Sequence, residues 1–149
     1  MHTDTTSLLN HLIETLKDGQ EGFRASSEDS GSPELKTILS KYSLQRSGFA
    51  GELQALAHSL GAKEPATSGS VAGALHRGWI GLKSALASRD AHAILAECER
   101  GEDSAVAEYR DALEHDELPA NIRHVIQQQS MGVQASHDRV RDLRDREAA

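Results

Sequence analysis

Apolar residues recur three and four positions apart along four long segments of this chain, and that repetition limits the fold more than any other feature. The segments span residues 5–27, 33–60, 90–114 and 119–146. This spacing places the apolar side chains on one face of an α-helix. The four apolar sets are Leu9, Leu12, Ile13, Leu16 and Phe23; Leu35, Ile38, Leu39, Tyr42, Phe49, Leu53, Leu56 and Leu60; Ile94, Leu95, Cys98, Ala105, Tyr109 and Leu113; and Ile122, Val125, Ile126, Val133, Val140 and Leu143. Four matched amphipathic helices predict one all-α domain, a four-helix bundle over residues 1–149.

The connection between the second and third helices predicts how the four are joined. It covers residues 61–89, whereas the other two connections are only a few residues long. Short connections join antiparallel neighbours, and a long one can run the length of a bundle. Two helical hairpins joined by one long crossover are the ferritin-like arrangement of a four-helix bundle.

The crossover itself carries a helical pattern over residues 70–87. We expect this extra short helix to dock on the bundle through its apolar stripe. The expected docking residues are Leu75, Trp79 and Leu82. An alternative interpretation makes Trp79, with His76 and Arg77, a surface patch for a partner, since Trp and Arg anchor many interfaces.

Charge and composition limit the classes of partner. The chain has 16 Lys and Arg residues against 23 Asp and Glu residues, a net charge of -7. Such an acidic domain is a poor general binder of phosphate backbones, so we expect no nucleic-acid partner. It has no apolar run of about eighteen residues that would span a membrane, and its N-terminal segment is too polar for a secretory signal. The single cysteine, Cys98, excludes an internal disulfide. We therefore expect a cytoplasmic protein.

Short motifs along most of the chain resemble those of an uncharacterised bacterial family with a ferritin-like four-helix fold. The matching stretches are Leu16-Lys17-Asp18-Gly19, Glu21-Gly22-Phe23, Gln45-Arg46, Phe49, Glu52-Leu53, Gly69-Ser70, His76-Arg77, Trp79, Glu99-Arg100-Gly101-Glu102, Tyr109, His137-Asp138 and Leu143-Arg144-Asp145. The resemblance implies a fold and no particular chemistry, because the family is a domain of unknown function. Ferritin-like relatives include iron stores, di-iron oxidases, peroxide-reducing rubrerythrins and small stress proteins.

The ligand motif of a di-iron bundle is missing. Such a site takes a Glu from each of two helices and a Glu-x-x-His pair from each of the other two. No Glu of this chain has a His three residues later. The nearest forms are Gln134 before His137, with an amide in place of a carboxylate, and His11 before Glu14, in reversed order.

A reduced metal site remains one hypothesis for the bundle centre. Counting residues along the four helices places three candidate ligands at similar heights. They are Glu21, Glu102 and His137, with Tyr42 and Cys98 beside them. One imidazole and two carboxylates suit iron, manganese or zinc.

An ion pair is the other hypothesis for the same region. Arg46 falls near this level and would neutralise Glu99 or Glu102 without any metal. We expect Arg46 to point toward these two acids, and we expect Cys98 to be a small core residue.

Two functions follow from these alternatives. The first is a non-enzymatic, stress-related structural or interaction module that lacks an intact di-iron centre and needs no cofactor. Its expected partner is a second copy of the chain or another protein. The second is a redox or iron-handling protein that holds iron or manganese with the reduced ligand set.

Overall fold

The computed structural model describes residues 2–62, 79 and 81–148, and within them every regular element is an α-helix. The helices are α1 (His2–Asp29), α2 (Pro33–Ser59), α4 (Leu82–Ser88), α5 (Ala91–Leu113) and α6 (Ala120–Ala148). The predicted all-α class is confirmed, and the four long helices begin and end within a few residues of their predicted bounds. Across the described ranges, no helix is long and apolar enough to cross a membrane.

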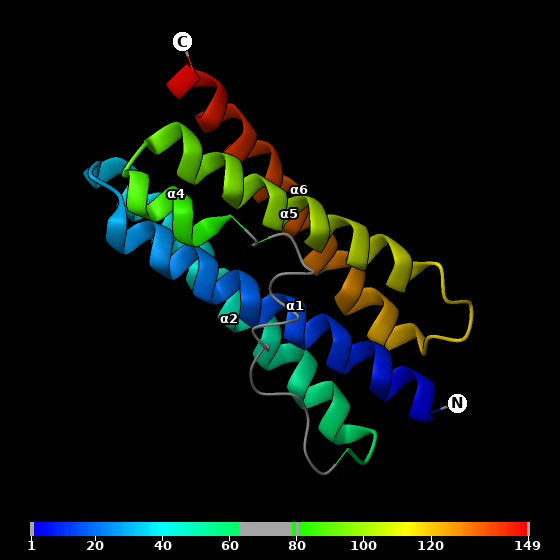
Figure 1. The fold of residues 1–149 in the computed structure, drawn as a ribbon. Coiled ribbons are helices and arrows are strands. Elements are labelled where there is room, and N and C mark those ends of the chain that lie inside the picture. Colours follow the sequence, from blue (N-terminus) through cyan, green and yellow to red (C-terminus); the bar gives the residue numbers. More distant parts are fainter. Residues whose placement is uncertain (1, 63–78, 80, 149) are drawn as a thin grey trace.

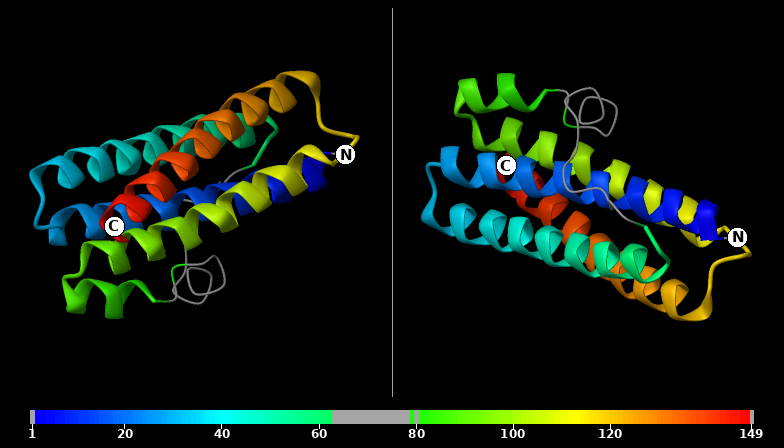
Figure 2. Two further views of the ribbon diagram at one scale, coloured as in Figure 1. Left: turned by 90° about the horizontal axis from the view of Figure 1, so that it is seen from above. Right: turned by 90° about the horizontal axis from the view of Figure 1, so that it is seen from below.

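Two antiparallel hairpins build the bundle (Figure 1). In one, α1 packs along α2, and in the other α5 packs along α6; the hairpins meet where α1 contacts α5 and α2 contacts α6. The end of α2 lies at the same end of the bundle as the N-terminus, whereas α5 begins at the opposite end, so these two helices run in the same direction (Figure 2). The connection between them therefore joins opposite ends of the bundle. This confirms the predicted topology of two hairpins and one long crossover.

Local sequence signals fix where the helices start. Ser32 caps α2: its hydroxyl accepts a hydrogen bond from the Leu35 N–H at 3.3 Å, and Pro33 follows as the first helical residue. Asp90 caps α5 and accepts from the His92 N–H at 3.2 Å. Both caps satisfy amide groups that the first turn of a helix leaves without partners.

The described part of the crossover contains one short helix, and Trp79 lies outside it. This helix, α4 (Leu82–Ser88), overlaps the end of the predicted range of 70–87 and begins three residues after Trp79. Gly81 occupies the N-cap of α4. Its N–H donates a hydrogen bond to the Glu97 carboxylate of α5 at 3.0 Å. Residues 70–78 and 80, which include Leu75, His76 and Arg77, lie outside the described residues.

The core consists of two apolar clusters, one toward each end of the bundle. The cluster nearer the N-terminus contains Leu9, Leu12, Ile13, Leu16, Ala50, Leu53, Ala57, Ala105, Tyr109, Ala112, Leu118, Ile122, Ile126 and Val133. The other contains Phe23, Leu35, Leu39, Tyr42, Trp79, Ala85, Ile94, Leu95, Cys98, Val140 and Leu143. Between the two clusters, each long helix has buried positions that are not large apolar residues, and one of them on each helix belongs to a single group around the Arg46 side chain. These four positions form the layer described next.

Candidate functional site

Each of the four long helices contributes one residue to a buried layer between the apolar clusters. The four residues are Gly19 of α1, Arg46 of α2, Glu102 of α5 and Ser136 of α6, and we call them the central layer. The side chains of Arg46 and Glu102 are 1% and 0% exposed. Each residue lies on the inward face of its helix, one turn from apolar core residues on either side.

The three polar side chains of the central layer bind one another. Arg46 Nη1 lies 2.5 Å from Glu102 Oε1, and Arg46 Nη2 donates to Ser136 Oγ at 2.5 Å. The Ser136 hydroxyl also contacts the second carboxylate oxygen of Glu102. Arg46 Nε donates to the Gln45 side-chain oxygen at 3.3 Å. Both carboxylate oxygens and all three guanidinium nitrogens therefore have partners, which offsets the cost of burying two charges.

The first helix shapes the space that Arg46 fills. A Cβ atom added to Gly19 would lie 3.5 Å from Arg46 Nη1 and 3.6 Å from its Cγ, so the arginine stem lies against the α1 backbone. One turn further, the Phe23 ring centroid lies 5.3 Å from Arg46 Cζ. A guanidinium at this distance from an aromatic face gains a favourable cation–π contact. Side chains larger than alanine at position 19 would compete with Arg46 for this space.

The central layer does not fit a di-metal centre. Two ions in a helical bundle need about four carboxylates and two imidazoles directed inward. This layer offers one carboxylate, and both of its oxygens are occupied by Arg46 and Ser136. The guanidinium stays protonated at any working pH, so it places a permanent positive charge where the ions would sit. Within the described part of the chain, no group of three His, Cys, Asp or Glu residues could hold a metal ion.

Glu21 does not lie at the bundle centre, so the predicted cluster of Glu21, Glu102 and His137 does not assemble. Its side chain is 64% exposed and pairs with Arg24 of the same helix at 2.9 Å. The prediction matched the heights of residues along the bundle and ignored the direction in which each one faces. Gly22 and Phe23 take the inward positions of that turn, which leaves Glu21 on the outer face of α1.

His137 lies at the edge of the α5–α6 seam and is separate from Glu102. Its Nε2 is 2.6 Å from Asp103 Oδ1, and its Nδ1 is 3.0 Å from Asp138 Oδ1. Burial opposes a charge on the ring, but hydrogen bonds and charge from Asp138 and Asp103 outweigh it and raise the pKa of His137 above its usual value. The arrangement is that of an imidazole between two carboxylates, which favour its charged form.

Glu99 has a different partner from the one expected. Its carboxylate binds Arg144 of α6, at the partly buried edge of the bundle. Arg46 therefore neutralises Glu102 alone. The reason is again helix phase, because Glu99 lies three residues before Glu102 and is turned toward the seam with α6.

The two other candidates near the centre, Cys98 and Tyr42, are packed in the apolar cluster that contains Phe23. Cys98 Sγ donates to the Ser26 hydroxyl at 3.4 Å, and burial raises the pKa of the thiol to about 12. A thiol in this setting is protonated and poorly reactive. The Tyr42 ring lies 5.6 Å from that of Phe23, and burial raises the pKa of its phenol.

The sequence pattern matches a known family over residues 4–115, which is most of the chain. That family is described as Domain of unknown function (DUF2383). The chain belongs to this family. Among curated proteins, none matches the chain.

The DUF2383 segment contains most of the central layer. It covers α1, α2 and α5, and with them Gly19, Arg46 and Glu102. Ser136 lies on α6, beyond the matched residues. The family match therefore includes both charged members of the layer, and the hydroxyl that joins them comes from the helix outside it.

Trp79, also in the DUF2383 segment, fills a space made by two glycines on neighbouring helices. A Cβ added to Gly22 of α1 would lie 2.5 Å from Trp79 Cε3, and one added to Gly101 of α5 would lie 2.2 Å from Trp79 Cε2. The indole meets Phe23 edge to face, with ring centroids 5.5 Å apart. Leu82 packs partly buried against the same cluster. Trp79 and Leu82 thus attach the end of the crossover to α1 and α5.

Sequence reasoning missed a second polar group in the core. The Tyr109 hydroxyl donates to Gln129 Oε1 at 2.7 Å, and Gln129 Nε2 donates to the Phe49 carbonyl at 3.1 Å and to Glu52 Oε1 at 3.3 Å. Ser136 was also missed. Both Gln129 and Ser136 continue the inward stripe of α6 in steps of three and four, and that spacing could have revealed them.

Proposed function

We propose that this protein is a non-enzymatic, ferritin-like helical bundle in which an internal ion pair replaces a metal centre, and that it acts as a structural or interaction module. The ferritin-like kinship is supported by the topology of two hairpins joined by one long crossover. This ferritin-like kinship is the basis for placing the protein among small stress-related bundles. The observation that supports this proposal most strongly is the buried ion pair of Arg46 and Glu102, both of which contact the Ser136 hydroxyl.

The ion pair supports a structural role because it occupies the polar groups that acid–base catalysis or metal binding would need. A general acid or base must reach a substrate, and a metal ligand must have free lone pairs. The Glu102 carboxylate is fully buried, and both its oxygens are engaged inside the protein. Among the residues that the structure describes, its ion-pair partner is Arg46, a residue that cannot give up its proton under physiological conditions.

The interaction half of the proposal is supported by two large apolar side chains left outside the core. Leu44 on α2 is 71% exposed, and Met131 on α6 is 67% exposed. Since α2 and α6 are neighbours, both side chains lie on the same pair of helices. We assign these helices to association with a second copy of the chain, because the apolar groups of a self-contacting surface become buried by their own counterparts.

The metal content of the protein tests the first half of the proposal. The full chain is purified without chelators or added metal, incubated with iron(II) or manganese(II), desalted and analysed for bound metal. We expect well below one equivalent per chain, with the same result for Glu102→Gln. Stoichiometric iron or manganese that is lost in Glu102→Gln would overturn the proposal and establish the metal-binding alternative.

Sedimentation velocity over a range of concentrations tests the second half. We expect the wild type to form dimers, and we expect Leu44→Glu or Met131→Glu to shift the protein to monomers. Ser7→Glu is a matched control, because it adds the same charge at an exposed polar position of α1, outside the two helices assigned to the contact. A wild type that stays monomeric at every concentration would contradict the self-association.

A further inference from the structure

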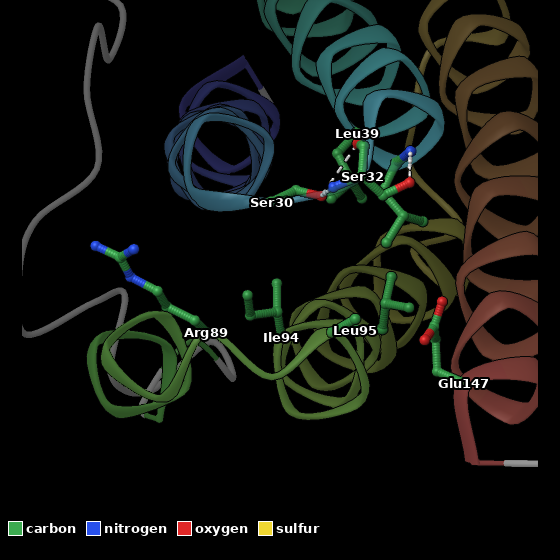
Figure 3. Close-up of a pocket in the computed structure, with 10 residues that line it drawn as sticks. Ser30, Ser32, Leu39, Arg89, Ile94, Leu95 and Glu147 are labelled. Carbon is green, nitrogen blue, oxygen red and sulfur yellow. Dashed lines mark hydrogen bonds between the residues drawn. The ribbon is translucent and has the colours of Figure 1, made fainter.

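The side of α2 that faces away from the bundle carries a row of small and apolar residues. The row consists of Thr37, Leu44, Gly48, Gly51 and Ala55, and we call it the outer α2 face. All five residues are exposed, and their spacings of seven, four, three and four place them along one side of the helix. The opposite side of α2 points into the bundle, where Leu39 lines a pocket together with Ile94 and Leu95 of α5 (Figure 3).

Gly48 and Gly51 have no packing partner that would explain them. Among the residues that the structure describes, a Cβ atom added to either one would meet nothing within 4 Å. By contrast, Gly22 and Gly101 face inward and make room for Trp79. Glycine within a helix is less stable than alanine, because it loses more conformational entropy on folding. Gly48 and Gly51 therefore weaken α2, and they leave room for a second backbone to approach from outside.

Leu44 is the one large apolar side chain of the outer α2 face, and it is 71% exposed. It lies one turn from Gly48 and two turns from Gly51, the two positions that have no side chain. In an antiparallel pair of α2 helices, a two-fold axis between residues 47 and 48 places Leu44 level with the partner's Gly51. The leucine of each copy then fills the space above a glycine of the other, and the glycines let the two helix axes come close.

Two charges on one edge of this face fit the same arrangement. Lys41 and Glu52 are eleven residues apart, which is close to three full turns, so both lie on the same side of α2. That side is the one toward α6, because Glu52 accepts a hydrogen bond from Gln129 Nε2 at 3.3 Å. The two-fold axis keeps each edge on its own side, and it brings the heights of Lys41 and the partner's Glu52 to within about 3 Å of each other. Opposite charges therefore meet twice, whereas like charges stay about 13 Å or more apart along the axis.

We propose that two copies of this chain associate through the outer α2 face as an antiparallel pair of α2 helices, with the two-fold axis next to Gly48. The inference rests on the proposed self-association and specifies its contact face and its register. A second copy is the partner because one row supplies both the leucine and the space that receives it, and one edge supplies both charges, as in a contact between identical surfaces. Met131 of α6 flanks the pair, since its neighbour Gly132 packs against Phe49, the residue after Gly48.

Cross-linking with a short bis-maleimide tests the register. Gly48→Cys should be captured as a covalent dimer, because residue 48 of both copies lies beside the axis. Ser40→Cys and Ala55→Cys should each fail to cross-link alone, since each lies about 22 Å along the axis from its own counterpart. A mixture of these two variants should cross-link, because residue 40 of one copy is level with residue 55 of the other. The wild type is the control for Cys98, which is buried.

Filling the space above Gly51 separates association from folding. Gly51→Leu should leave the urea midpoint of the dilute protein unchanged or raised, because leucine is a better helix former than glycine. The same change should raise the dimer dissociation constant at least about tenfold in sedimentation velocity, since the partner's Leu44 loses its space. Ala107→Leu is the matched control, because it enlarges an exposed small residue of α5. It should leave the dissociation constant within about twofold of the wild-type value.

Charge reversal tests the edge of the contact. Lys41→Glu and Glu52→Lys should each weaken the dimer several-fold, because each change places like charges at matching heights. The double variant Lys41→Glu/Glu52→Lys should recover most of the wild-type affinity, since opposite charges face each other again. A double variant as weak as the sum of the two single changes would contradict the pairing of Lys41 with the partner's Glu52.

The outcomes distinguish this inference from the self-association on which it rests. Dimers that tolerate Gly51→Leu and do not yield a cross-linked Gly48→Cys product would overturn the inference and leave the self-association intact, because another face would then join the copies. Ser40→Cys that cross-links alone would contradict the antiparallel register. A wild type that stays monomeric at every concentration would overturn both the self-association and the inference.

Discussion

Arg46 and Glu102 meet at 2.5 Å in the core although they come from diagonally opposed helices that otherwise do not pack together. The guanidinium and carboxylate therefore reach across the centre of the bundle, and Ser136 of a third helix joins them. A buried pair of this kind contributes little net stability compared with well-packed apolar residues, but losing one partner is expensive. Because its members come from α2, α5 and α6, we expect the pair with Ser136 to fix the register of these three helices.

The packing of Trp79 against Gly101 predicts that substitutions of these two residues have coupled effects on the free energy of unfolding. Gly101→Ala should destabilise the protein by about 1 to 3 kcal/mol, because its new Cβ would overlap the indole. In a Trp79→Ala background, the same change should become neutral or stabilising by up to about 1 kcal/mol, as expected for glycine to alanine within a helix. Urea unfolding of the four proteins measures the coupling. Equal effects of Gly101→Ala in both backgrounds would show that the indole is not seated on Gly101.

Trp79→Ala alone should cost about 3 to 5 kcal/mol, the range for removing a buried aromatic side chain. The loss comes from the contacts with Phe23 and with the two glycines. Equilibrium unfolding followed by circular dichroism measures it. A loss below about 1 kcal/mol would favour the interpretation of Trp79 as part of an exposed partner site.

The pH dependence of stability should report on His137. Its pKa is raised in the folded protein above the value of 6.5 that applies to an unperturbed histidine. The charged form is therefore favoured by folding. The resulting stabilisation is fully present below about pH 6.5 and is lost as the pH rises through the folded pKa.

We expect His137→Gln to lower the free energy of unfolding more at pH 5.5 than at pH 8.5. Unfolding curves at both values measure the difference. In an Asp103→Asn background the difference should shrink, since the imidazolium loses a partner that lies 2.6 Å away. A larger loss of unfolding free energy at pH 8.5 than at pH 5.5 would contradict the predicted direction of the pH dependence.

Cys98 should be unreactive until the protein unfolds. At pH 8 almost none of the thiol is ionised when its pKa is about 12, and its side chain has no contact with solvent. Labelling with a chromogenic disulfide should be slow in buffer and fast above the urea midpoint. Rapid stoichiometric labelling of the native protein would show that the sulfur is accessible.

Helices and topology followed from the sequence because they depend on local periodicity and on connection lengths. The stripe of Leu9, Leu12, Ile13 and Leu16 can bury itself on only one side of a helix, and that side is the core. The short turn at Ser32 and the long connection after Gly61 left one simple arrangement of hairpins. No contact between distant residues was needed for either inference.

The site was harder to predict because it depends on how each helix is rotated. Neighbouring residues of a helix face directions about 100° apart, so equal height along the bundle does not bring two side chains together. Glu21 illustrates the error, since it is level with core residues but faces solvent. Arg46 and Glu102 continue the apolar stripes of their helices, and that phase is what brings them together. The partners of His137 and Glu99 depend on the seam between α5 and α6, which the sequence does not define.

A double-mutant cycle on Arg46 and Glu102 tests the central layer most directly. Arg46→Met and Glu102→Met should each cost about 3 to 5 kcal/mol of unfolding free energy, because each leaves the other charge buried without its partner. The double variant should lie within about 1 kcal/mol of the wild type, since two apolar side chains of similar volume fill the layer and Ser136 keeps its hydrogen bond to the Val133 carbonyl. Losses that simply add in the double variant would contradict the account, because they would show that the two charges do not depend on each other.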